Sequence, residues 1–106
     1  MIVDAAALLA FFDRSASNHW AVMGEIELAA GFERLVVSPF VIAELEIAVR
    51  REHGPQGWLT VLDELAGGAW TIASVTPGHL AAMSARVASG ASLAEASVAA
   101  LAKRDE

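Results

Sequence analysis

Three short apolar segments, each followed by a stretch of helical character, limit what this chain can fold into. They are rich in β-branched side chains, which favour strands, and they cover residues 2–3, 35–37 and 70–75. Ser38-Pro39 and Thr76-Pro77 follow the last two, and in each pair a capping hydroxyl precedes a Pro suited to the first helical turn. Strands that alternate with helices are joined by right-handed crossovers. The sequence therefore predicts an α/β fold with a short parallel sheet.

Caps, glycines and apolar spacing divide the rest of the chain into helices. Ser17 or Asn18 is placed to cap one of them, and Gly54-Pro55 is expected to break the chain between two others. The expected helices cover residues 5–12, 19–30, 39–52, 58–65, 77–89 and 93–101. Because no repeat or linker interrupts this order, we expect one domain over residues 1–106.

The composition disfavours several classes of protein. Hydrophobic residues make up 56% of the chain, yet no apolar run reaches the roughly 18 residues that a membrane span needs. Asp4 stands where a signal peptide would carry basic residues, so we expect a soluble, cytoplasmic protein without a membrane partner. The absence of Cys disfavours disulfides and structural zinc. The histidines lack ligand spacing, and we expect surface or packing roles for His19, His53 and His79.

The formal net charge is −6, from 13 acidic and 7 basic residues. A protein that coats nucleic acid normally presents a basic face, which this composition does not indicate. Acidic side chains can still approach phosphates when they hold divalent cations, because the ion reverses the local charge. Composition alone leaves both possibilities open.

Three carboxylates are expected at one edge of the sheet. Asp4 follows the first strand, Glu44 lies in the second turn of the helix after the second strand, and Glu95 lies in the first turn of the last helix. Ligands of α/β sheets collect beyond the carboxyl ends of the strands. Clustered carboxylates repel one another unless a cation holds them, and oxygen ligands favour Mg²⁺ or Mn²⁺. Such ions serve phosphodiester hydrolysis.

Each carboxylate also has a purely structural interpretation. Asp4 is a favoured helix N-cap. Ser92 and Glu95 have the spacing of a capping box, which is sufficient to explain Glu95. Glu44 has apolar neighbours that favour an inward position, whereas Glu46 is expected to be solvated. On spacing alone, the metal site and the structural interpretation stay equally open.

Four segments of the chain, taken in order, form a pattern found in one family. They are MIVD at residues 1–4 with ALLA after it, VVSPFVIAEL at 36–45, LDELAGG at 62–68 and LAEASVAALA at 93–102. Together they resemble a PIN-domain ribonuclease, and specifically a VapC-type toxin of a bacterial toxin–antitoxin pair. The resemblance covers the whole chain, and the first two motifs are fairly specific in combination.

This resemblance implies a PIN-like three-layer α/β fold and an Mg²⁺- or Mn²⁺-dependent endoribonuclease that acts on RNA. It also implies a homodimer and a small cognate antitoxin that inserts a segment into the active-site groove. Asp4 and Glu44 match the family's first two acidic residues, and Glu95 stands where the third is found. By this resemblance the three residues hold one or two Mg²⁺ ions, and a metal-activated water attacks the scissile phosphate.

The chain departs from the family pattern at three points. Ala6 replaces the usual Ser or Thr, so a hydroxyl that supports the site is missing, and Glu95 replaces the usual Asp. The family continues into a final strand that carries a Thr-x-Asp motif with a fourth acidic group, whereas this sequence stops at Glu106. Asp105 and Glu106 are not expected to take its place. We therefore expect a C-terminally truncated PIN-like fold without the final strand.

Two alternatives compete with the ribonuclease hypothesis. The three departures favour a catalytically inactive module that retains dimer or antitoxin binding. A receiver-like phosphoacceptor domain also uses acids at the edge of a parallel sheet. It would need an acidic pair after the first strand and an Asp after the third, where this chain has Ala5 and Thr76. The ribonuclease is the leading hypothesis, and the inactive module is its main competitor.

Overall fold

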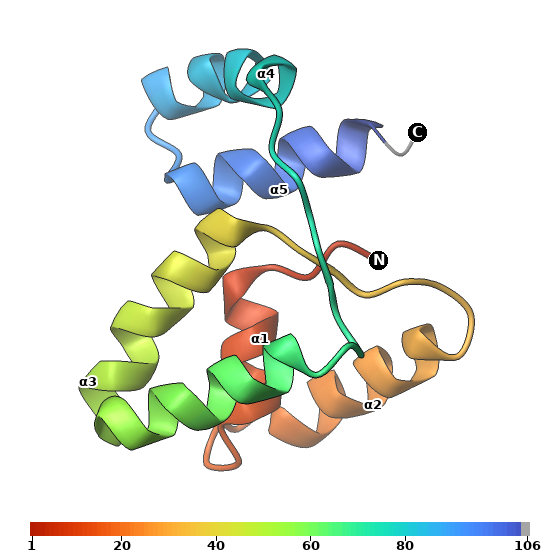
Figure 1. Cartoon of the computed structure of the whole chain (residues 1–106), viewed down its shortest axis with the longest axis vertical. Coiled ribbons are helices and arrows are strands. Elements are labelled where there is room, and N and C mark those ends of the chain that lie inside the picture. The colour runs from red at the N-terminus through yellow and green to blue at the C-terminus, as the bar shows by residue number, and fades with distance from the viewer. Residues whose placement is uncertain (105–106) are drawn as a thin grey trace.

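The computed structural model describes residues 1–104, and within them five helices surround a small parallel sheet (Figure 1). In chain order the elements are α1 (Ala5–Phe12), α2 (His19–Ala30), β1 (Val36–Val37), α3 (Pro39–Ala66), β2 (Thr71–Ile72), α4 (Pro77–Ala88) and α5 (Leu93–Arg104). The expected alternation of strands and helices is confirmed. The expectation for Asp105 and Glu106 concerns residues outside the described part of the chain.

The sheet is parallel, as predicted. Val36 pairs with Thr71 and Val37 with Ile72, and Ile2 forms a single parallel bridge to Val36. β1 therefore lies between the N-terminal segment and β2. This order brings the points where the N-terminal segment and β1 enter their helices to the same edge of the sheet.

The strands are shorter than the sequence predicted. The first is reduced to a bridge because Asp4 already caps α1, which leaves little extended chain before the helix. The third, expected over residues 70–75, pairs only over β2. Its last hydrogen bond to β1 runs from the Ala73 N–H to the Val37 carbonyl at 2.9 Å. Beyond it β1 has ended, since Ser38 is the N-cap of α3.

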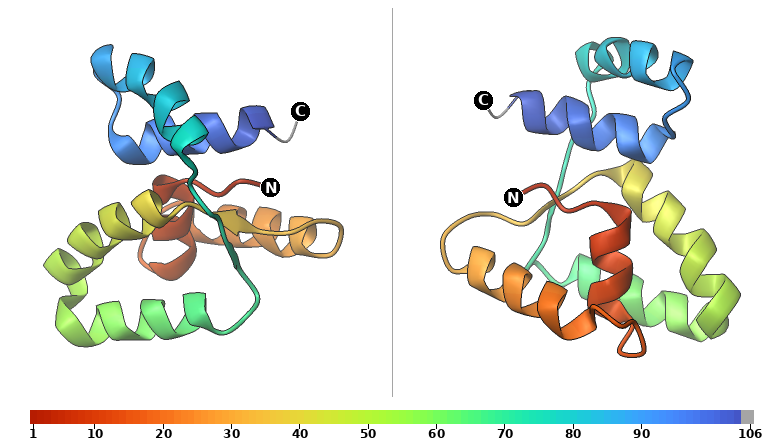
Figure 2. Two further views of the ribbon diagram at one scale, coloured as in Figure 1. Left: turned by 45° about the horizontal axis from the view of Figure 1, so that its top comes forward. Right: turned by 180° about the vertical axis from the view of Figure 1, so that it is seen from behind.

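Helices cover both sides of the strands, so the three-layer arrangement is confirmed. In Figure 1, α4 and α5 lie above the strands, and α1, α2 and α3 lie below them. Figure 2 shows the N-terminal segment, β1 and β2 crossing between these two groups of helices. α5 packs against α4 on one side and α3 on the other.

Most of the core lies between the strands and the lower helices. Its side chains follow the apolar stripes of the sequence, and each fully buried Val or Leu contributes about 1.5–3 kcal/mol to folding. The larger buried members are Val3, Leu8, Ile26, Leu35, Val37, Val41, Leu45, Val49, Trp58, Val61, Leu65 and Trp70. Phe11 packs edge-to-face on Trp70, with ring centroids 5.4 Å apart. Within the described residues, no helix is both long enough and apolar enough to cross a membrane.

Two of the three histidines are packing residues, as expected. His79 is buried and completes a capping box with Thr76 at the start of α4. His19 is also buried, and its Nδ1 lies 2.7 Å from the carbonyl of Ala10. Because a carbonyl only accepts, Nδ1 carries the proton and donates it. The buried Nε2 has no hydrogen-bond partner among the described residues.

α3 contains the predicted break. Gly54 adopts φ 70° and ψ −173°, and Pro55, which has no N–H, follows it. The expected helices over residues 39–52 and 58–65 are the two halves of α3 on either side of this kink. A Cβ on Gly57 would lie 2.4 Å from the Cβ of His53. The turn is therefore tight enough to require a glycine at this position.

We predict opposite effects for alanine at two helical glycines. Gly57→Ala forces a Cβ against His53, and we expect it to destabilise the protein by about 1–3 kcal/mol, as in overpacked sites. Gly24→Ala in α2 meets nothing within 4 Å and should stabilise the protein by about 0.5–1 kcal/mol through helix propensity. Urea unfolding measures both changes. Equal stabilisation by the two alanines would contradict the tight kink.

Candidate active site

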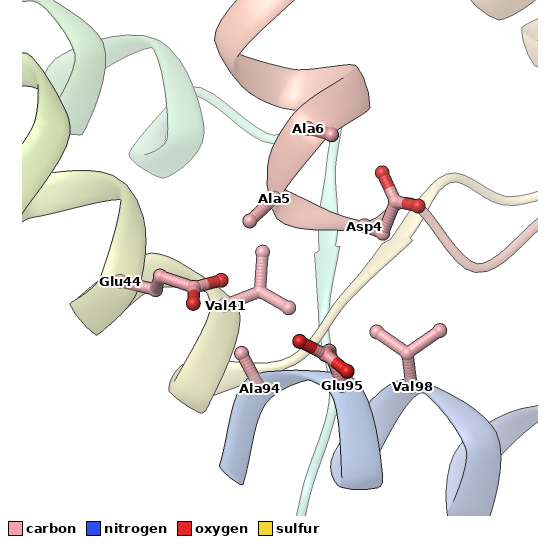
Figure 3. A pocket seen from close by; sticks show the side chains of 8 residues that line it. All are labelled: Asp4, Ala5, Ala6, Val41, Glu44, Ala94, Glu95 and Val98. Carbon is pink, nitrogen blue, oxygen red and sulfur yellow. The ribbon is translucent and has the colours of Figure 1, made fainter. Parts of the chain in front are cut away.

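The three predicted acidic residues line one pocket. Asp4, Glu44 and Glu95 border a cavity of about 300 Å³ where the N-terminal parts of α1, α3 and α5 meet (Figure 3). The residues are distant in sequence and belong to three separate helical starts, so only the fold brings them together. Their expected convergence is confirmed, while their role as metal ligands stays a prediction.

Three helix N-termini therefore point toward the same region. The N-terminus of a helix carries a partial positive charge and unpaired N–H groups, which favour nearby anions. This arrangement explains why three carboxylates can lie here although none of the Lys or Arg side chains that the structure describes lines the pocket. The backbone supplies part of the opposite charge that side chains do not.

Asp4 is a helix cap and a pocket residue at once. Its Oδ1 accepts a hydrogen bond of 2.8 Å from the Ala7 N–H at the start of α1. That bond orients the carboxylate and leaves the second oxygen exposed beside the pocket. The capping and ligand interpretations, which the sequence left open, are therefore compatible for this residue.

Glu95 makes only half of the predicted capping box. Its N–H donates to the Ser92 Oγ at 3.1 Å. In the described part of the chain, its carboxylate makes no return bond to the Ser92 N–H and is exposed at the pocket instead. The capping interpretation thus explains Ser92 but does not account for the acid at position 95.

Glu44 and Glu46 lie on different sides of α3, as predicted. Glu44 reaches the pocket from the second turn of the helix (Figure 3). Glu46 forms an ion pair with Arg50 one turn later, with its Oε2 2.8 Å from the guanidinium Nε. Glu46 is partly exposed there, so the two acids are distinguished by their surroundings although only one residue separates them.

A buried pair of hydroxyls joins α3 to α5. The Oγ atoms of Ser38 and Ser97 lie 2.7 Å apart, and both side chains are 0% exposed. Ser97 donates its proton to the Ala94 carbonyl at 2.8 Å, so Ser38 donates to Ser97 and accepts from the Phe40 N–H at 3.1 Å. Every hydroxyl proton has an acceptor, as a buried polar pair requires.

Sequence reasoning missed the small and apolar walls of the pocket. Val41, Ala94 and Val98 line it between the acids. The spacing of residues 94, 95 and 98 on one helical face was the available signal. Ala6 also borders the pocket, so a methyl group occupies the position where the family pattern has a hydroxyl. The acids therefore lie beside apolar walls that supply no hydrogen bonds of their own.

The donor set of the pocket fits a hard divalent cation. Its ionisable side chains, within the described part of the chain, are carboxylates and include no imidazole. The oxygens of Asp4, Glu44 and Glu95 do not form a tight cage with all ligand atoms within 4.8 Å. Mg²⁺ commonly keeps several waters and takes one or two carboxylates directly. A roomy pocket with three acids suits that mode of binding.

A different group in the described residues does bring three ligand atoms within 4.8 Å: Asp13, Glu52 and His53. None of them lines the acidic pocket. Hydrogen bonds from the Ser15 hydroxyl and N–H lower the pKa of Asp13, and the charge of His53 lowers it further. Sequence reasoning missed this group because the kink of α3 brings His53 and the chain after α1 together. All three side chains are at least partly exposed, and their contacts are those of an ordinary surface charge cluster.

The family of the chain follows from its similarity to known proteins. A family model described as the PIN domain matches residues 1–106, the whole length of the sequence. The chain belongs to the PIN-domain family. The resemblance noted in the four sequence segments is thereby confirmed, together with the α/β arrangement that it implied.

Two proteins similar to this PIN domain are VapC proteins of Mycobacterium tuberculosis. The chain is 49% identical over 74 residues to Ribonuclease VapC26, a match that covers 70% of this chain and 53% of that protein. It thus spans about half the length of this relative. The crystal structure of VapC20, described as a toxin that cleaves the sarcin–ricin loop, is similar with a TM-score of 0.81. That match covers 98% of this chain and 82% of VapC20 at 14% identity, which shows a shared fold alone.

We predict that Ser97→Ala destabilises this PIN domain by about 1–3 kcal/mol, because the buried Ser38 hydroxyl loses its acceptor. Ser89 is a matched control, since it also donates to a backbone carbonyl, that of Ala85, but is exposed. Ser89→Ala should stay within about 0.5 kcal/mol of the wild type. Urea unfolding followed by tryptophan fluorescence measures both. Equal losses would show that the buried pair contributes no more than a surface hydrogen bond.

Proposed function

We propose that this PIN domain is a metal-dependent endoribonuclease, the toxin of a toxin–antitoxin pair, which cleaves RNA phosphodiester bonds at the acidic pocket. The observation that carries the proposal is the convergence of Asp4, Glu44 and Glu95 from three helices on one cavity. The similarity to Ribonuclease VapC26 supports RNA as the substrate. Family membership supports the placement of the site, because the same three positions carry the resemblance.

The positions of the three acids indicate the part that each plays in metal binding. Glu44 and Glu95, whose carboxylates make no hydrogen bond within the described chain, are the principal ligands of Mg²⁺ or Mn²⁺. Asp4 contributes its second oxygen while Oδ1 remains bonded to the Ala7 N–H. When bound, the ion supplies an activated water and neutralises charge that develops on the scissile phosphate.

We further propose a cognate antitoxin and a second copy of the chain as partners, in the cytoplasm. Large apolar side chains remain exposed on α2 and just after it, where Trp20, Leu28 and Phe32 are 71%, 68% and 84% exposed. Exposed apolar side chains of this size are typical of protein–protein contact surfaces when they gather in one patch. Membership of the PIN-domain family and the similarity to Ribonuclease VapC26 support the same assignment, which was expected from the resemblance to VapC-type toxins.

The first test of this proposal is RNA cleavage with and without metal. We expect the purified protein to cleave RNA with Mg²⁺ or Mn²⁺ and not with EDTA, and Asp4→Asn to abolish cleavage. Asn still accepts the Ala7 N–H as a helix cap, so the loss reflects chemistry rather than unfolding. Glu46→Gln is the control, since it neutralises an acid that is paired with Arg50 outside the pocket, and it should cleave like the wild type.

The same assay decides between the enzyme and the inactive module. If the wild type is as inert as Asp4→Asn on several RNAs, the enzyme proposal is wrong, and the inactive module that retains dimer or antitoxin binding replaces it. Ala6→Ser adds a hydroxyl at the pocket wall. A gain of cleavage in that variant would indicate that the missing hydroxyl limits the activity.

Metal binding can be tested apart from catalysis through Glu95. Glu95→Gln removes the charge but leaves the Ser92 cap, so its melting temperature without metal should stay near that of the wild type. Mg²⁺ should raise the melting temperature of the wild type more than that of Glu95→Gln. A ligand at 100 times its Kd stabilises the native state by about 2.7 kcal/mol, and the variant loses part of this gain because it has lost one ligand of the ion. Thermal melts across a Mg²⁺ titration measure the difference. Equal gains in both proteins would exclude Glu95 as a ligand.

A further inference from the structure

A second hollow lies along the hairpin formed by α4 and α5 and shares one lining residue with the acidic pocket. Its volume is about 710 Å³, and it lies over the C-terminal half of α4, the turn after it and the start of α5. Glu95 borders both this hollow and the acidic pocket. Figures 1 and 2 show the turn between α4 and α5 at the same end of the molecule as the start of α3. An extended chain that occupies both hollows therefore passes Glu95.

The second hollow is open because its walls are small. It is lined by Ala82, Ala85, Ser89, Gly90 and Ala91. Gly90 has φ 104°, a conformation that L side chains rarely adopt, and it lets the chain turn back from α4 into α5. A side chain here would be strained and would also narrow the hollow. The surface that results is shallow and suits an extended backbone rather than a compact ligand.

Among the side chains that the structure describes, Arg86 is the only basic one that lines either hollow. Among the described residues it makes no hydrogen bond or ion pair, whereas Arg50 on α3 is paired with Glu46. Its position in the last turn of α4 favours a cation through the helix dipole. The helix dipole would favour a cation equally at a position that faces open solvent. It therefore does not explain why the guanidinium borders a hollow that shares Glu95 with the acidic pocket.

We propose that Arg86 is a substrate-positioning residue, which binds a backbone phosphate of the RNA next to the phosphodiester held at the acidic pocket. This inference rests on the proposed function and extends it along the substrate. A guanidinium binds a phosphate through two parallel N–H donors, which fixes orientation as well as supplying charge. The small walls of the second hollow let the sugar–phosphate chain approach that guanidinium.

Arg86 matters for RNA binding because the protein as a whole is negatively charged. The chain carries a net charge of −6, and three carboxylates border the pocket, so the surroundings repel a polyanion even when a divalent ion is bound. A cation beside the pocket offsets this repulsion on one side only. It therefore favours one path for the RNA across the site, in which the neighbouring phosphate lies over α4.

The test compares two variants that change the net charge equally. Cleavage of a fluorescently labelled pool of random-sequence, single-stranded RNA is measured with Mg²⁺ over a range of KCl concentrations. For Arg86→Gln we expect the apparent KM to rise about tenfold at low salt and kcat to change less than threefold. The salt dependence of kcat/KM should weaken by about 0.7 in logarithmic slope, the value for one phosphate contact to a single strand. Arg86→Lys should recover part of the KM.

Arg51→Gln is the matched control, because Arg51 is exposed on α3 and lines neither hollow. It should leave the KM and the salt slope close to those of the wild type. If the wild type cleaves RNA while Arg86→Gln and Arg51→Gln behave alike, the role of Arg86 is overturned and the proposed function stands. The same conclusion follows if Arg86→Gln lowers kcat with an unchanged KM and salt slope. If the wild type neither cleaves nor binds the labelled RNA, both proposals are overturned.

Discussion

The hydrogen bond between Ser38 and Ser97 is the contact on which the acidic pocket depends, because it joins the helices that carry Glu44 and Glu95. These exposed carboxylates repel one another, and in water two charges 4 Å apart interact by only about 1 kcal/mol. Leaving a buried hydroxyl without its partner costs about 1–3 kcal/mol. The buried pair, helped by the apolar contacts around it, is thus strong enough to hold the acids at one cavity.

The convergence of helix starts explains why structural and chemical interpretations of the acids did not exclude one another. Asp4 caps α1 with one oxygen and keeps the other exposed. Ser92 takes the capping role in α5, which leaves the Glu95 carboxylate without a structural task. A residue type that stabilises a helix N-terminus is also the type that ligates a hard cation. The sequence pattern therefore could not separate the two roles, whereas the hydrogen bonds of the folded chain do so.

The order of elements, the caps and the break at Gly54 were predictable because each rests on a local signal, such as a capping hydroxyl before Pro or a Pro without an N–H. The convergence of Asp4, Glu44 and Glu95 was also predictable, since parallel topology sends these positions to one edge. The strand lengths were not, because the third strand pairs only until β1 ends at the Ser38 cap, and the first strand forms a single bridge to β1. The Ser38–Ser97 pair depends on packing between segments far apart in the sequence, which no local pattern encodes.

The distribution of charge implies an order of events for the proposed reaction. Without an ion, the acidic pocket presents three carboxylates, and the positive ends of three helices offset them only in part. A phosphate that approaches this surface is repelled. A bound divalent cation offsets most of this repulsion and attracts the scissile phosphate directly, and Arg86 adds a cation at the neighbouring hollow. In this arrangement metal binding precedes productive RNA binding, so the net negative charge of the chain is compatible with a nucleic-acid substrate.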